Sequence, residues 1–74
     1  MLTADQVVHA CQQCGLTDPQ ITGTGFVCTS TGALLDDVLM DGVWQVLTLE
    51  RESLGRTGDY DELVAILNEN KEKL

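Results

Sequence analysis

The sequence predicts a small α+β domain with the element order helix, strand, helix, strand, helix and a short antiparallel sheet packed on the helices. Three observations support this prediction. The chain has 74 residues, so it can build one core, and we expect residues 1–74 to form a single domain. Helix-capping patterns occur near both ends, and runs rich in β-branched residues lie between them.

The first helix is expected over residues 4–14. Thr3 and Gln6 have the spacing of a capping box, in which each side chain bonds the backbone of the other residue. Apolar residues then recur every three or four positions, which places one stripe of the helix against a core. This stripe consists of Val7, Cys11 and Cys14.

The segment from Ile21 to Thr29 is rich in Thr, Val and Phe and is expected to be a strand. Gly23 and Gly25 interrupt it, which predicts a bulge or tight bend at that point. A second strand is expected over the β-branched and aromatic segment from Val43 to Arg51.

The segment from Ala33 to Met40 fits either a helix or a strand. As a helix it has an apolar stripe opposite three aspartates. As the first strand of a hairpin turning at Asp41 and Gly42, it would set Asp36 opposite Leu47, which is poor cross-strand chemistry. We therefore expect a helix, with helix, three strands, helix as the alternative order for the whole chain.

The last part of the chain is expected to hold a polar loop and a helix. Residues Ser53 to Gly58 include two glycines and are expected to form the loop. Asp59 has the spacing to Glu62 of a capping box, so the final helix is expected to begin near Asp59.

The charge of the chain limits its partners. Twelve Asp and Glu residues against four Lys and Arg residues give a formal net charge of −8. This charge opposes contact with phosphate backbones and anionic lipids, so we expect no direct nucleic-acid binding and no membrane binding. It favours encounter with a basic protein surface, and such surfaces are common on proteins that handle nucleic acids.

The chain is expected to be cytoplasmic. Its start has no basic and apolar leader pattern, and no apolar run has the length that a membrane span needs. Three cysteines, an odd number, do not match the disulfide framework of a small secreted protein.

Cys11 and Cys14 form a CxxC pair, and both lie on the apolar stripe of the first helix. They stand near its C-terminal end, where the helix dipole disfavours a thiolate, so we expect core cysteines and not a redox pair. A structural zinc site needs four ligands, and the remaining candidates are Cys28 and His9. His9 points away from the cysteine stripe, so we expect no metal site.

No catalytic arrangement is evident in the sequence. The single histidine has no nucleophile at a recognisable spacing. The glycine-containing stretches Gly23-Thr24-Gly25 and Ser30-Thr31-Gly32 lack the pattern of a phosphate-binding loop. We therefore expect a protein that is not an enzyme and that needs no cofactor.

The candidate partner-binding residues are acidic side chains and the single tryptophan. The carboxylates would form a field suited to a groove lined by Arg or Lys if the fold gathers them on one face. Tryptophan leads the statistics of interface hot spots when it is exposed, although a core role is the more common one. The candidates are Asp36, Asp37, Asp41, Glu50, Glu52 and Trp44.

These features predict a protein-binding domain, an acidic inhibitor or modulator that docks on a larger basic protein complex. Small phage inhibitors of restriction nucleases and CRISPR complexes are similar in size and charge, which is a likeness of type and not of motif. On this hypothesis, replacing Asp36 and Asp37 by lysine weakens binding without unfolding the domain. The alternatives are a thiol-based sensor or metal-binding protein using Cys11, Cys14 and Cys28, and a small structural homodimer.

Overall fold

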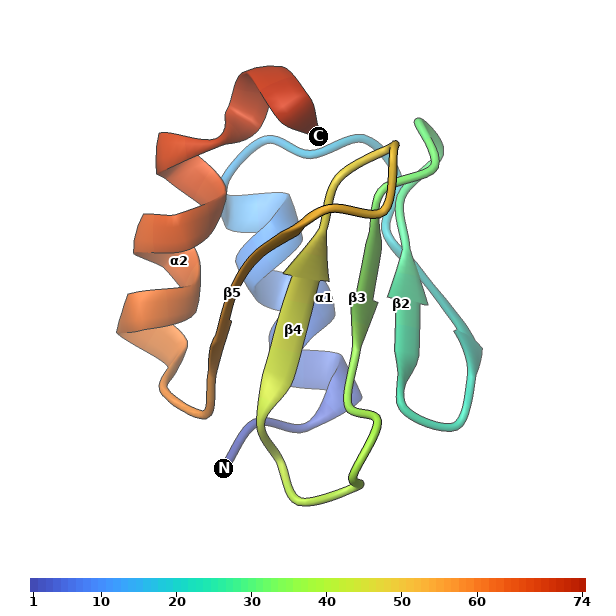
Figure 1. The fold of residues 1–74 in the computed structure, drawn as a ribbon, viewed down its shortest axis with the longest axis vertical. Helices are drawn as coiled ribbons and strands as arrows, with labels where there is room; N and C mark the ends of the chain where they lie inside the picture. The colour runs from blue at the N-terminus through green and yellow to red at the C-terminus, as the bar shows by residue number, and fades with distance from the viewer.

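The structure is a computed structural model that describes all residues from 1 to 74, and it shows one sheet with two helices on one of its faces (Figure 1). The strands follow one another as an antiparallel meander in the order β1-β2-β3-β4-β5. Helix α1 lies behind the sheet in Figure 1, and α2 lies beside β5. The elements are α1 (Ala4–Gln13), β1 (Gln20–Gly23), β2 (Phe26–Cys28), β3 (Leu34–Asp36), β4 (Trp44–Leu47), β5 (Ser53–Thr57), α2 (Tyr60–Glu69) and the 3-10 turn η1 (Lys71–Lys73).

The α+β class is confirmed, and the predicted order helix, strand, helix, strand, helix is wrong because the middle of the chain contains five strands and no helix. The alternative with three strands between two helices is nearer to the observed order. The segment Ile21 to Thr29 is two strands, because the chain turns back between Gly23 and Phe26. The segment Ser53 to Gly58 is mostly strand β5 and not a loop.

The segment Ala33 to Met40 is a strand followed by a loop, and the expected helix does not form. Leu35 of β3 lies between Val27 and Val46 of the neighbouring strands, and all three side chains are fully buried against the helices. The pairing with β4 is shifted by two residues from the tight hairpin considered above, so Asp36 faces Gln45 and not Leu47. The longer loop removes the poor pairing that argued against a strand.

Both predicted helix starts are confirmed. Thr3 Oγ1 accepts a hydrogen bond from the Gln6 backbone N–H at 3.2 Å, and Gln6 Oε1 accepts one from the Thr3 N–H at 2.9 Å. Asp59 Oδ2 accepts a hydrogen bond from the Glu62 N–H at 3.0 Å and caps α2. These contacts are local in sequence, which is why sequence spacing identifies them.

Strand β5 contains a glycine because a helix passes close to it. Gly55 has a φ of +150° and lies under Ile66 of α2, where an added Cβ would come within 3.3 Å of Ile66 Cδ1. Glycine in a strand weakens it intrinsically, but here it permits the close approach of the helix. That tertiary reason has no counterpart in the local sequence, so the segment was expected to be a loop.

The core lies between the helices and one face of the sheet. Trp44 is 2% exposed, and its indole N–H donates a hydrogen bond to the Leu2 carbonyl at 2.9 Å. The opposite face of the sheet has no element packed on it, and we call it the open face. The fully buried large side chains are Trp44, Leu35, Leu63, Leu67, Val7, Val27, Val46 and Cys11.

Candidate protein-docking loop and open sheet face

The loop between β3 and β4, residues 37–43, is held in shape by one buried carboxylate, and we call it the Asp37 loop. Asp37 Oδ1 accepts a hydrogen bond from the Asp41 N–H at 3.0 Å, and Oδ2 accepts one from the Gly42 N–H at 3.0 Å. Asp41 Oδ1 in turn accepts from the Val43 N–H at 3.1 Å. Hydrogen bonds to a charged acceptor are stronger than neutral ones, so the loop has a defined conformation.

Two neighbouring segments fix the position of the loop. The Asp37 N–H donates to the Gly25 carbonyl at 2.8 Å, and the Leu2 N–H donates to the Gly42 carbonyl at 2.9 Å. Gly25 has a φ of +78°, and an added Cβ would lie 3.1 Å from the Asp37 carbonyl oxygen and 2.9 Å from Met40 Sδ. Glycine is therefore required in the β1–β2 turn both for its conformation and for the contact with the loop.

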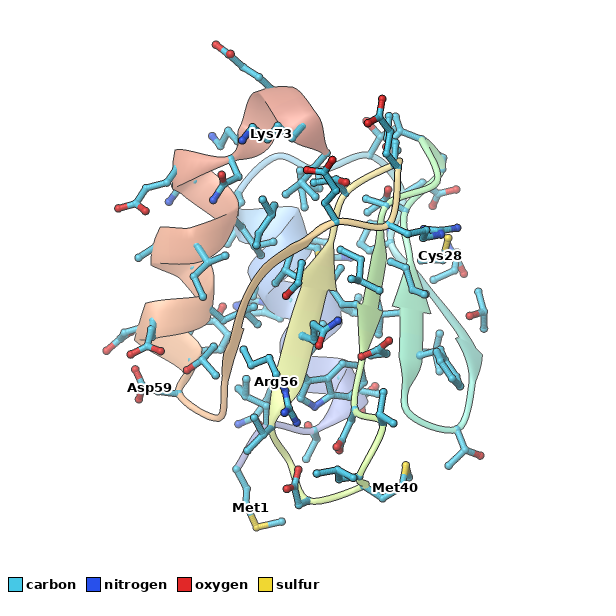
Figure 2. All side chains as sticks on the ribbon, viewed as in Figure 1. Met1, Cys28, Met40, Arg56, Asp59 and Lys73 are labelled. Atoms are coloured by element: carbon cyan, nitrogen blue, oxygen red, sulfur yellow. The ribbon has the colours of Figure 1, made fainter.

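The loop exposes three consecutive apolar side chains. Val38, Leu39 and Met40 are 67%, 66% and 56% exposed. Figure 2 shows Met40 at the lower end of the molecule, where Met1 also lies, and the Met40 sulfur lies over Gly25 of the β1–β2 turn. A run of exposed apolar residues in a loop closed by side-chain hydrogen bonds is uncommon in a free domain, and such patches mark interaction surfaces.

Acidic residues surround this end of the molecule, which we call the loop end. Both helices begin there, so the aspartates and the glutamate of their first turns and caps join those of the Asp37 loop (Figure 1). Seven carboxylates and one guanidinium, that of Arg56, give the loop end a side-chain charge of −6 out of the total of −8. The seven are Asp5, Asp36, Asp37, Asp41, Asp59, Asp61 and Glu62.

Glu50 and Glu52 lie at the other end of the molecule, so the sheet does not bring all the predicted carboxylates together. They belong to the turn between β4 and β5, beside the C-terminal turn that carries Lys73 (Figure 2). This turn and the C-terminus line a shallow hollow of about 320 Å³. Its lining residues are Thr48, Leu49, Glu50, Glu52, Glu72 and Lys73.

Three of the predicted partner-binding residues are buried, which changes how they can act. Trp44 belongs to the core described above and presents no surface to a partner. Asp37 is 7% exposed, and both of its carboxylate oxygens are engaged inside the loop. Asp37 therefore positions the exposed apolar residues instead of contacting a partner itself.

Asp36 is also buried, and it lies on the open face of the sheet. It is 7% exposed, and its Oδ1 is buried without a hydrogen-bond partner. Burial raises the pKa of this carboxyl, Arg56 opposes the rise, and the negative charge of Asp37 adds to it. The cost of a buried unsatisfied carboxylate oxygen is substantial, so this group requires an explanation.

The three cysteines do not form one site. Cys11 of α1 and Cys14 at the end of that helix face the core. Cys28 lies on the open face, on the other side of the sheet. Burial raises the pKa of the Cys11 thiol to about 12, with a smaller contribution from Cys14. The Cys14 thiol donates to the Val64 carbonyl at 3.6 Å, and burial raises its pKa too, although Lys71 opposes the rise. These thiols are weak nucleophiles at neutral pH.

Groups that would support metal or acid–base chemistry are dispersed. No group of three or more His, Cys, Asp and Glu side chains is arranged to hold a metal ion. His9 is exposed on α1 and stacks on Tyr60 with ring centroids 6.0 Å apart.

Neither helix has the length and hydrophobicity needed to cross a bilayer.

The exposed residues Val38, Leu39 and Met40 were not among the predicted binding residues. The expected helix over Ala33 to Met40 places Val38 and Leu39 on its apolar stripe, because a run of Leu and Val is typical of a buried face. A local signal was nevertheless present: Asp37 followed by Asp41 and Gly42 is the pattern of a loop closed by an aspartate side chain.

Comparison with models of protein families, with curated proteins and with solved structures finds no match to this chain.

Proposed function

We propose that this protein is a non-enzymatic binding domain that docks its loop end onto a basic surface of a larger protein and modulates or inhibits that protein. The observation that carries the proposal is the Asp37 loop, which presents Val38, Leu39 and Met40 to solvent in a hydrogen-bonded conformation. The partner surface that fits has an apolar pocket with Lys and Arg residues at its rim.

Preorganisation of the loop favours tight binding. A disordered segment must lose conformational entropy when it binds, and this cost subtracts from its affinity. In the Asp37 loop, side-chain and backbone hydrogen bonds already fix the residues on both sides of the apolar run. Apolar side chains on a preformed support bury their surface at a lower entropic cost, and methionine is enriched at protein interfaces.

The charge distribution indicates the kind of partner. The loop end carries most of the net charge of the chain, and charge concentrated around an apolar contact increases the association rate with a surface of opposite sign. Proteins that handle nucleic acids carry such basic surfaces. A domain docked there would compete with the phosphate backbone, which is a direct route to inhibition.

We expect a charge reversal at the loop end to weaken association more than the same reversal at the other end. The test pair is Asp41→Lys with Asp61→Lys, and the matched control is Glu50→Lys with Glu52→Lys. All four residues are exposed, and each double variant changes the net charge by the same amount. The association rate with a protein captured from native lysate should fall about tenfold or more for the loop-end pair only.

Salt provides a second readout of the same prediction. Raising the ionic strength should weaken capture by the wild type and have less effect on the loop-end variant, because attraction between opposite charges is screened. An equal fall of the association rate in the two double variants would show that overall charge, and not the loop end, determines association.

A further inference from the structure

The open face of the sheet carries two rows of side chains that lie across the strands. The register places directly paired residues on the same face, so each row can be followed from β2 to β5. The lower row is Phe26, Asp36, Gln45 and Arg56. The upper row is Cys28, Leu34, Leu47 and Ser53.

The charge of this face differs from that of the rest of the molecule. It holds one carboxylate, Asp36, and one guanidinium, Arg56, so its side chains sum to zero in a chain of net charge −8. Phe26 is 41% exposed, and Leu34 and Leu47 are partly exposed. A neutral, partly apolar face is poorly suited to the basic partner that the loop end favours. It is better suited to another face that is also neutral and partly apolar.

Asp36 and Arg56 lie in the same row with Gln45 between them. Asp36 Oδ1 is buried and unpartnered, whereas Arg56 is exposed and points in front of the sheet in Figure 2, on the side away from α1. No hydrogen bond joins the two side chains within the chain. The open face therefore contains the carboxylate of a residue that is 7% exposed, with no hydrogen-bond donor within the chain, and an exposed guanidinium that is free to reach another molecule.

We propose that a second copy of this chain packs on the open face, related by a two-fold axis parallel to β4. Strand β4 lies midway between β3 and β5, so rotation about this axis brings Asp36 of each copy opposite Arg56 of the other. Packed sheets lie about 10 Å apart, a gap that an aspartate and an extended arginine can bridge. Such an interface is self-complementary, as two-fold dimers require.

The same axis brings the apolar residues of the upper row together. Leu47 lies on β4 and would meet Leu47 of the other copy at the axis, with Leu34 close to it. The axis runs along the strands, so both Asp37 loops would project from the same end of the dimer. Dimerisation does not depend on the proposed function, but two loops on one side would allow bivalent docking.

Charge exchange between copies tests this proposal by sedimentation equilibrium. Arg56→Glu alone and Asp36→Arg alone should each weaken self-association more than about 30-fold, because each leaves a buried charge facing a like charge. An equimolar mixture of the two variants should associate as a heterodimer with affinity near that of the wild type, because it restores both opposite-charge pairs. If Asp36 paired only with Arg56 of its own chain, mixing the two variants would not restore association.

A second variant keeps the test decisive if Asp36→Arg fails to fold. Leu47→Lys should abolish the dimer by setting two ammonium groups face to face, and the control Leu49→Lys, in the turn that follows β4, should not. Salt should strengthen the wild-type dimer, which is opposite to its effect on docking, because it screens the repulsion between two chains of charge −8 more than the attraction of the Asp36–Arg56 pairs enclosed between the sheets. A wild-type monomer at concentrations up to about 1 mM would overturn the proposal.

Discussion

Replacing Asp37 by lysine is expected to unfold the domain. The two carboxylate oxygens accept hydrogen bonds from the Asp41 and Gly42 N–H groups, and the residue is 7% exposed. Each hydrogen bond to a charged group contributes about 1.5–3 kcal/mol, and a core of this size supplies a free energy of unfolding of about 3–5 kcal/mol. The loss of both hydrogen bonds and the burial of an ammonium group would together cost more than this free energy of unfolding.

Circular dichroism during urea titration would measure the effect of Asp37→Lys. The matched control is Asp41→Lys, which makes the same charge change at an exposed position in the same loop and should remain folded. This expectation replaces the sequence-based hypothesis that Asp36 and Asp37 can both be reversed without unfolding, because both side chains are buried. A folded Asp37→Lys variant with a normal transition would show that the loop does not depend on this carboxylate.

Replacing Asp36 by asparagine is expected to stabilise the isolated domain and weaken self-association. The substitution keeps the shape of the side chain and removes a charge that is buried without a full set of hydrogen bonds. We expect the free energy of unfolding at pH 7 to rise by about 2 kcal/mol in dilute protein, where the chain is monomeric. A residue that costs stability while it supports an interface is typical of a functional site.

The difference in free energy of unfolding between Asp36→Asn and the wild type depends on pH. Burial raises the pKa of Asp36 above its ordinary value of 3.8, with Arg56 opposing the rise and Asp37 adding to it. The folded state therefore binds the proton more readily than the unfolded state, so protonation favours folding. The advantage of Asp36→Asn should be largest at neutral pH and should shrink as the pH falls through the raised pKa towards 3.8.

Urea titrations of wild type and Asp36→Asn at several pH values would measure this dependence. Asp41→Asn, at an exposed residue of the adjoining loop, is the control and should show no comparable trend. A variant less stable than the wild type at pH 7 would mean that the Asp36 carboxylate is stabilised within the monomer, and it would remove the main argument for a second copy on the open face.

Sequence patterns predicted the parts of the fold that depend on local contacts. The helix starts at Thr3 and Asp59 follow from side-chain caps that span three residues, so spacing alone identifies them. Strand β5 was missed because Gly55 is explained by the approach of Ile66, which is distant in the sequence. Strand β3 was missed because its short run of apolar residues fits a helix equally well.

The candidate site was predicted only in part, for a related reason. Acidic composition pointed to a charged docking surface, and the first turns of the two helices contribute to it together with Asp41. Composition does not reveal that Glu50 and Glu52 belong to the opposite end, because that follows from the meander of the sheet. Nor does it distinguish the buried Asp37 from the exposed Asp41, which depends on hydrogen bonds in the folded loop.

The most direct test of the docking loop is a quantitative comparison of two serine variants in capture experiments from a lysate of the cells in which the protein occurs. Leu39 is 66% exposed in the Asp37 loop, and Leu49 is 50% exposed at the other end, so Leu39→Ser and Leu49→Ser remove similar apolar surface from opposite ends. Both substitutions should change the free energy of unfolding by less than about 0.5 kcal/mol. We predict that Leu39→Ser loses a basic protein partner that wild type and Leu49→Ser retain; equal capture by all three proteins would contradict docking through this loop.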